Sequence, residues 1–99
     1  MQDRKGLCYE LALKRVLQDD EGTLVHGTVF AGAPRRKIYH AWVELGDKVY
    51  DPVLDELFDK DTFYSKFGAE STVKYDAESA AIMSARTGKY GPWIGPGSK

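Results

Sequence analysis

The stretch that decides the fold is KIYHAWVELGDKVYD, residues 37–51. Two runs rich in β-branched and aromatic residues, 37–45 and 48–51, flank the pair Gly46-Asp47. Such runs predict strands, and a two-residue loop with glycine first suits a type I′ or II′ turn. The sequence therefore predicts a tight antiparallel hairpin.

The turn also sets which residues face each other across the hairpin. The predicted pairs are Leu45 with Lys48, Val43 with Tyr50, and Trp42 with Asp51. Because side chains alternate between the two faces of a strand, His40 and Asp51 are then expected on the same face as diagonal neighbours. Their Cα atoms would lie roughly 7–8 Å apart, within reach of an imidazole–carboxylate hydrogen bond. A slip of one residue would separate them.

The third reactive residue is the only cysteine, Cys8, in the segment GLCYELAL, residues 6–13. Apolar residues dominate positions 7–18 and predict a helix that is buried on most sides, with Cys8 near its start. The partial positive charge of a helix N-terminus stabilises a thiolate. The sequence therefore predicts Cys8 as a nucleophile, His40 as its base and Asp51 as the group that orients the imidazole.

The order of these segments resembles the papain-like superfamily, and more closely its transglutaminase-like branch with its minimal bacterial and phage members. The resemblance covers roughly residues 2–53 and depends mainly on HAWV at 40–43 followed by Asp-Pro at 51–52. The chain departs from that family in being much shorter than typical members. It also has Tyr9 after the cysteine, where tryptophan is frequent in the family.

The resemblance implies a role for each matching residue. Cys8, His40 and Asp51 match the catalytic triad. Gln2 stands six residues before the cysteine, where papain-type enzymes place a glutamine that helps to bind the oxyanion. The backbone N–H of Cys8 is the second predicted oxyanion donor. Trp42 is expected to cover the histidine–aspartate pair and keep water out.

The whole chain, residues 1–99, is expected to form a single α+β domain. Its N-terminal helix would pack on a small antiparallel sheet, as in a papain-like or transglutaminase-like core, followed by additional C-terminal helices. The remaining strands are predicted at 23–30 and 71–75.

The C-terminal half offers weaker signals. Residues 53–68 are acidic and amphipathic and predict one or two short helices, with Asp61 as a cap and Gly68 as a stop. A last helix is expected between Asp76, as its N-cap, and Gly88, as its stop.

The end of the chain is rich in turn-forming residues. Positions 90–99 contain three glycines and two prolines and predict an irregular tail that is partly docked on the core. Trp93 and Ile94 are the side chains expected to dock.

Composition limits the classes of partner. The chain has 99 residues and a net charge of −1, so no strong overall charge directs it to nucleic acid or to an anionic membrane. A lone cysteine cannot form an internal disulfide and fits a reducing compartment. Neither a signal peptide nor an apolar run near the ~20 residues of a membrane span is apparent. We therefore expect a cytoplasmic protein with a protein or peptide substrate and no cofactor, and oligomeric state is left open.

Other residues of the chain suggest competing chemistry. His26 is a competing base, but no carboxylate lies at hairpin distance from it, so a structural role is favoured. A zinc site from Cys8, His26 and His40 is conceivable, yet metal-ligand spacing such as Cys-x-x-Cys is absent, and no metal is expected. The acidic residues after position 54 lack the pattern of a calcium loop and predict a solvated helix face.

Two functions from different classes remain. The first is a cysteine hydrolase or acyltransferase that acts on an amide, ester or thioester through the Cys-His-Asp triad. The triad alone does not separate a protease from a deamidase or an acyltransferase. The alternative is a non-catalytic protein-binding module on the same fold, of the kind used as phage accessory proteins or inhibitors.

Overall fold

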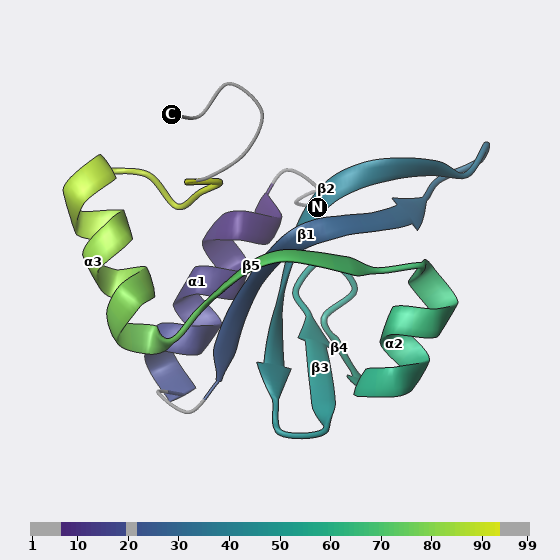
Figure 1. The fold of residues 1–99 in the computed structure, drawn as a ribbon, viewed down its shortest axis with the longest axis horizontal. Helices are drawn as coiled ribbons and strands as arrows, with labels where there is room; N and C mark the ends of the chain where they lie inside the picture. The colour runs from purple at the N-terminus through teal and green to yellow at the C-terminus, as the bar shows by residue number, and fades with distance from the viewer. Residues whose placement is uncertain (1–6, 20–21, 94–99) are drawn as a thin grey trace.

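The computed structural model describes residues 7–19 and 22–93. Within these residues, three helices and a five-stranded antiparallel sheet form an α+β fold, so the predicted α+β class is confirmed (Figure 1). The strand order across the sheet is β4-β3-β2-β1-β5. The elements in chain order are α1 (Cys8–Asp19), β1 (Thr23–Ala31), β2 (Arg36–Leu45), β3 (Lys48–Asp51), β4 (Glu56–Asp59), α2 (Lys60–Phe67), β5 (Glu70–Tyr75) and α3 (Ala77–Thr87).

The hairpin of β2 and β3 forms in the predicted register. Val43 pairs with Tyr50 and Leu45 with Lys48. Gly46 has a φ of 65° in the turn, in the left-handed region that glycine adopts without steric cost. The pairing stops at Val43, so the predicted pair of Trp42 with Asp51 is not part of the ladder. Among the described strands, the first half of β2 therefore pairs with β1 alone, and its other edge is open.

Both faces of the sheet are covered by helices. Figure 1 shows α1 and α3 on one side and α2 on the other. Ala41 and Val43 of β2 belong to the buried cluster on the α1 side, together with Leu13. Trp42 belongs to the cluster on the α2 side, together with Phe63. Alternate side chains of β2 thus pack into two separate cores, which explains why so much of this strand is apolar.

The first part of residues 53–68 is a strand, and the prediction of helix there is wrong. Residues 56–59 form β4, which pairs antiparallel with β3 along its whole length. The free edge of β3 supplies the hydrogen bonds of this strand, and Phe58 packs into the cluster under α2. Pairing and burial therefore override the acidic composition, as tertiary context often does.

The ends of the last two helices follow the predicted signals in part. The N-cap of α2 is Asp59 and not Asp61, which lies in the first turn, while Gly68 ends the helix with a φ of 56° as predicted. For α3, Asp76 is the N-cap and its side chain accepts the backbone N–H of Ser79 at 2.8 Å. Both glycine stops adopt the left-handed conformation that closes helices.

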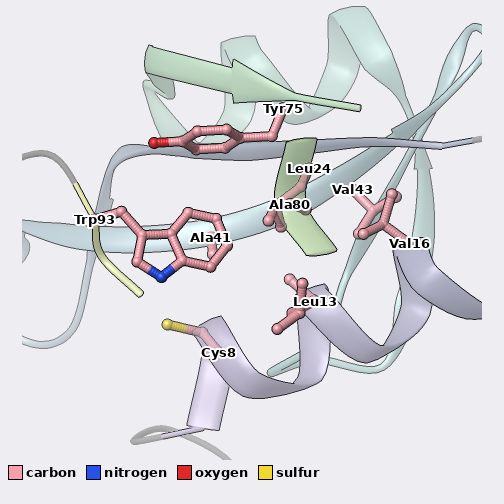
Figure 2. Close-up of a cluster of buried hydrophobic side chains, with 10 residues drawn as sticks. Cys8, Leu13, Val16, Leu24, Ala41, Val43, Tyr75, Ala80 and Trp93 are labelled. Atoms are coloured by element: carbon pink, nitrogen blue, oxygen red, sulfur yellow. The ribbon is translucent and has the colours of Figure 1, made fainter. Parts of the chain in front are cut away.

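The segment after α3 returns to the α1 side of the sheet. Trp93 is buried, and its ring centroid lies 5.0 Å from that of Tyr75 and 5.1 Å from that of His26. Figure 2 shows Cys8 directed from the first turn of α1 toward this indole. The segment therefore closes the core beside Cys8, and Ile94 lies outside the described residues. None of the helices in the described ranges is long and apolar enough to cross a membrane.

Candidate active site

His40 and Asp51 meet at the open edge of β2. His40 Nε2 lies 3.0 Å from Asp51 Oδ2, and both side chains are only 7% exposed. The other carboxylate oxygen, Oδ1, accepts the backbone N–H groups of Val53 at 2.9 Å and Leu54 at 3.2 Å. The turn after β3 therefore fixes the carboxylate, and the carboxylate fixes the orientation of the imidazole ring.

The titration of these two groups is coupled. Burial lowers the pKa of His40, but the interactions of the ring with Asp51 and with Cys8 raise it more, to about 9. Burial raises the pKa of Asp51, whereas the hydrogen bond and charge of His40 and the two backbone donors lower it more, to below its ordinary value. Both shifts favour an imidazolium–carboxylate pair at neutral pH.

Cys8 reaches this pair from the opposite side of the sheet. It is the first residue of α1, is 6% exposed, and belongs to the α1-side cluster. It nevertheless lines the same pocket as His40 and Asp51. Because Asp51 engages Nε2 of His40, Nδ1 is the ring nitrogen left for an interaction with Cys8. The open edge of β2 is what allows residues from two faces to meet.

The start of α1 also offers donors for a negatively charged oxygen. The first four N–H groups of a helix have no partner within the helix, and they carry its partial positive charge. The backbone N–H of Cys8, the first residue of α1, is one of these groups and belongs to the same residue as the sulfur. Gln2, the predicted side-chain donor, lies outside the described residues.

Trp42 has a different position from the one predicted. It is fully buried, and its ring centroid lies 6.0 Å from that of His40. It does not line the pocket that Cys8, His40 and Asp51 share. Its Nε1 donates to the hydroxyl of Tyr64 at 3.3 Å. Trp42 thus supports His40 from the core and does not cover the histidine–aspartate pair from the solvent side.

The shared pocket has a volume of about 370 Å³, at the lower end of the range for small-molecule sites. Cys8, His40 and Asp51 line one part of it. The rest of its described wall is mostly aliphatic or aromatic. These apolar residues are Val29, Ala31, Ile38, Val53, Leu54 and Phe67.

His26, the competing base, does not line this pocket. It is buried, and within the described ranges neither ring nitrogen has a hydrogen-bond partner. Burial lowers its pKa to about 4, so the ring is neutral at pH 7. It packs instead against Tyr9 at 4.9 Å and Tyr75 at 5.3 Å between ring centroids. The described residues also contain no cluster of three or more potential metal ligands.

A polar network that the sequence analysis missed supports the α2 side. Glu44 is buried, and it accepts hydrogen bonds from the hydroxyl of Tyr64 at 2.5 Å and from Lys74 Nζ at 3.2 Å. Burial raises its pKa, but these hydrogen bonds and the charges of Lys74 and Lys60 lower it more. A carboxylate two positions after Trp42, on the same face of a buried strand, was the signal in the sequence.

Replacing Tyr64 by phenylalanine removes the hydroxyl that joins Trp42 to Glu44. We expect the free energy of unfolding of Tyr64→Phe to fall by ~1–3 kcal/mol, because the indole N–H of Trp42 and the carboxylate of Glu44, both poorly solvated, each lose a hydrogen-bond partner. Urea denaturation measures the change. Tyr39→Phe is the matched control, since Tyr39 is 59% exposed, and its effect should stay within ~0.5 kcal/mol. Equal stabilities of the two variants would contradict the network.

Comparison of the chain with protein families, with curated proteins and with solved structures finds no match. The case for a function therefore depends on the geometry of the pocket.

Proposed function

We propose that the chain is a cysteine hydrolase or acyltransferase with a papain-like, transglutaminase-like core, which acts on an amide, ester or thioester, with a protein or peptide as its substrate. One observation carries the proposal. The imidazole of His40 is held by Asp51 through Nε2 and faces the pocket that Cys8 lines. This is the arrangement that activates a thiol by an oriented base.

The reaction follows from these positions. The sulfur of Cys8 attacks the carbonyl carbon, and the resulting oxyanion is stabilised by the N-terminus of α1. The imidazolium of His40 gives its proton to the leaving group as the carbon–heteroatom bond breaks, which leaves a thioester on Cys8. His40 then removes a proton from water or an amine, which attacks the thioester and frees the sulfur. Asp51 keeps its charge and stabilises the imidazolium throughout.

The rate of Cys8 alkylation by iodoacetamide, measured against pH, tests the proposal. We expect rapid labelling of the wild type below pH 7. In His40→Gln the rate at pH 6.5 should fall about 10-fold or more, because an ordinary thiol is only about 1% ionised at this pH. The fall is smaller than about 100-fold because the thiolate of an ordinary thiol is more nucleophilic than that of a thiol with a lowered pKa. Asp51→Asn should give a smaller decrease and leave circular dichroism unchanged.

His26→Gln is the matched control, because it removes the histidine that does not line the pocket. Its alkylation profile should follow that of the wild type. A wild-type rate that rises only near pH ~8.5 and ignores His40 would overturn the proposal and favour the protein-binding module.

A further inference from the structure

The pocket beside Cys8 carries information about the substrate. Its apolar side chains come from four places: the end of β1, the start of β2, the turn after β3 and the end of α2. Apart from the triad, the one polar group among its described lining residues is the phenol of Tyr39, which is mostly exposed. Such walls stabilise an apolar group that leaves water.

The charges at the pocket point the same way. His40 and Asp51 pair with each other, and no lysine, arginine or glutamate is among the described lining residues. A charged group that entered the pocket would leave water without gaining a counter-ion. An anionic group would also be repelled by Asp51 and by a thiolate at Cys8.

The volume sets the size of the occupant. A water-sized group takes about 30 Å³ in a liquid, so about 370 Å³ holds roughly a dozen such groups, part of them at the open mouth. We propose that this pocket binds the acyl part of the substrate, and that the acyl part is an uncharged aliphatic chain of about four to eight carbons. The inference rests on the proposed function and adds the class of acyl group that the protein or peptide substrate carries.

The chemical step with an ester probe is simple. The sulfur of Cys8 forms a bond to the acyl carbon, the carbon–oxygen bond of the phenyl ester breaks, and the leaving phenolate takes the electron pair and the proton of the His40 imidazolium. Water then attacks the thioester, with His40 as the base, and releases the carboxylic acid.

Three 4-nitrophenyl esters with the same leaving group test the acyl class: the acetate, the hexanoate and the mono-adipate. Release of 4-nitrophenolate gives the acylation rate, from which the rate of the Cys8→Ser variant is subtracted. Mass spectrometry confirms that the acyl group is on Cys8. Each rate is divided by that of the same ester with N-acetylcysteine, which removes intrinsic differences in reactivity. We expect the hexanoate to acylate Cys8 about 10-fold faster than the acetate and about 10-fold faster than the adipate.

A charge placed on the pocket wall tests the location. Leu54 is 49% exposed, so Leu54→Lys is compatible with the fold, and the backbone N–H that Asp51 accepts is kept. The ratio of adipate to hexanoate rates should rise about 10-fold in this variant, because the lysine pairs with the adipate carboxylate. Ile82→Lys is the matched control, since Ile82 is 47% exposed on α3 and does not line the pocket. Its ratio should equal that of the wild type.

The outcomes separate the two proposals. Equal normalised rates for all three esters would overturn the aliphatic acyl class while leaving Cys8 as a nucleophile. A preference for hexanoate that Leu54→Lys does not change would overturn the assignment of the acyl group to this pocket. No Cys8-dependent acylation by any ester would overturn the proposed function, and the inference with it.

Discussion

Gly27→Ala is expected to lower the free energy of unfolding by about 3 kcal/mol or more. A Cβ at Gly27 would lie 2.1 Å from the carbonyl oxygen of Glu70 and 2.8 Å from the Cη2 atom of Trp42. The first contact is with backbone of β5 and the second with a fully buried ring, so neither neighbour can move without loss of pairing or packing. For a domain of this size, whose total stability is roughly 5–15 kcal/mol, such a loss is a large fraction.

The position of Gly27 ties this effect to the candidate site. Gly27 pairs with His40 across β1 and β2, and the pairing with β5 shifts between His26 and Gly27. We expect urea denaturation, followed by tryptophan fluorescence, to show a lower midpoint, and the remaining folded protein to alkylate Cys8 with a weaker dependence on pH.

Gly46→Ala is the control for the general effect of replacing a glycine. Gly46 has a φ of 65°, but an added Cβ meets no atom within 4 Å. The free energy of unfolding of Gly46→Ala should therefore fall only by the cost of the backbone strain, ~1–2 kcal/mol. If Gly27→Ala were no more destabilising than Gly46→Ala, the result would contradict a close approach of β5 to β1 at Gly27.

The parts of the fold that depend on neighbouring residues could be predicted from the sequence. A two-residue turn with glycine first fixes the register at Val43 and Tyr50, and alternation then places His40 and Asp51 on one face. The caps of α3 at Asp76 and Gly88 are local as well. In each case a side chain or a backbone torsion within a few residues decides the outcome.

The parts that depend on distant residues could not. Residues 56–59 pair with β3 because its edge is free, and an acidic segment gives no local sign of this. The glycine at position 27 is required by β5, more than 40 residues later in the chain. Nor does alternation predict that Cys8 meets His40 from the opposite face, because this depends on where the pairing of β2 with β3 stops.

The second large effect concerns the pH dependence of stability in the Cys8→Ser variant. We expect its free energy of unfolding to fall as the pH rises from about 6.5 toward 9, by up to ~3 kcal/mol. The pKa of His40 in the folded protein is raised to about 9, above the ordinary 6.5 of the unfolded chain. The folded state therefore binds the proton of His40 more tightly than the unfolded chain does. The resulting stabilisation is complete below pH 6.5 and is lost as the pH rises through the pKa of His40 in the folded protein. Without Cys8, Asp51 alone holds the pKa up, so the loss ends below pH 9.

The window is suited to this measurement. The lowered pKa values of His26 and Asp51 act below pH 6.5, and the pKa values of Tyr9 and Tyr64, both raised to about 12, act above the window. Urea denaturation at half-unit steps of pH follows the change. The double variant Cys8→Ser/His40→Gln should show no fall between pH 6.5 and 9, and a fall of the same size there would assign the effect to another group.

Comparison with the wild type then reports the protonation state of the site. If Cys8 is a thiolate beside the imidazolium, folding moves a proton from the thiol to His40, and the folded and unfolded chains bind the same number of protons between pH 6.5 and 8.5. The free energy of unfolding of the wild type should therefore change little in this range. That of Cys8→Ser should lose much of the stabilisation that the proton on His40 provides. Equal slopes would mean that the thiol keeps its proton next to His40, and a sulfur in that state is not the activated nucleophile that the proposed reaction requires.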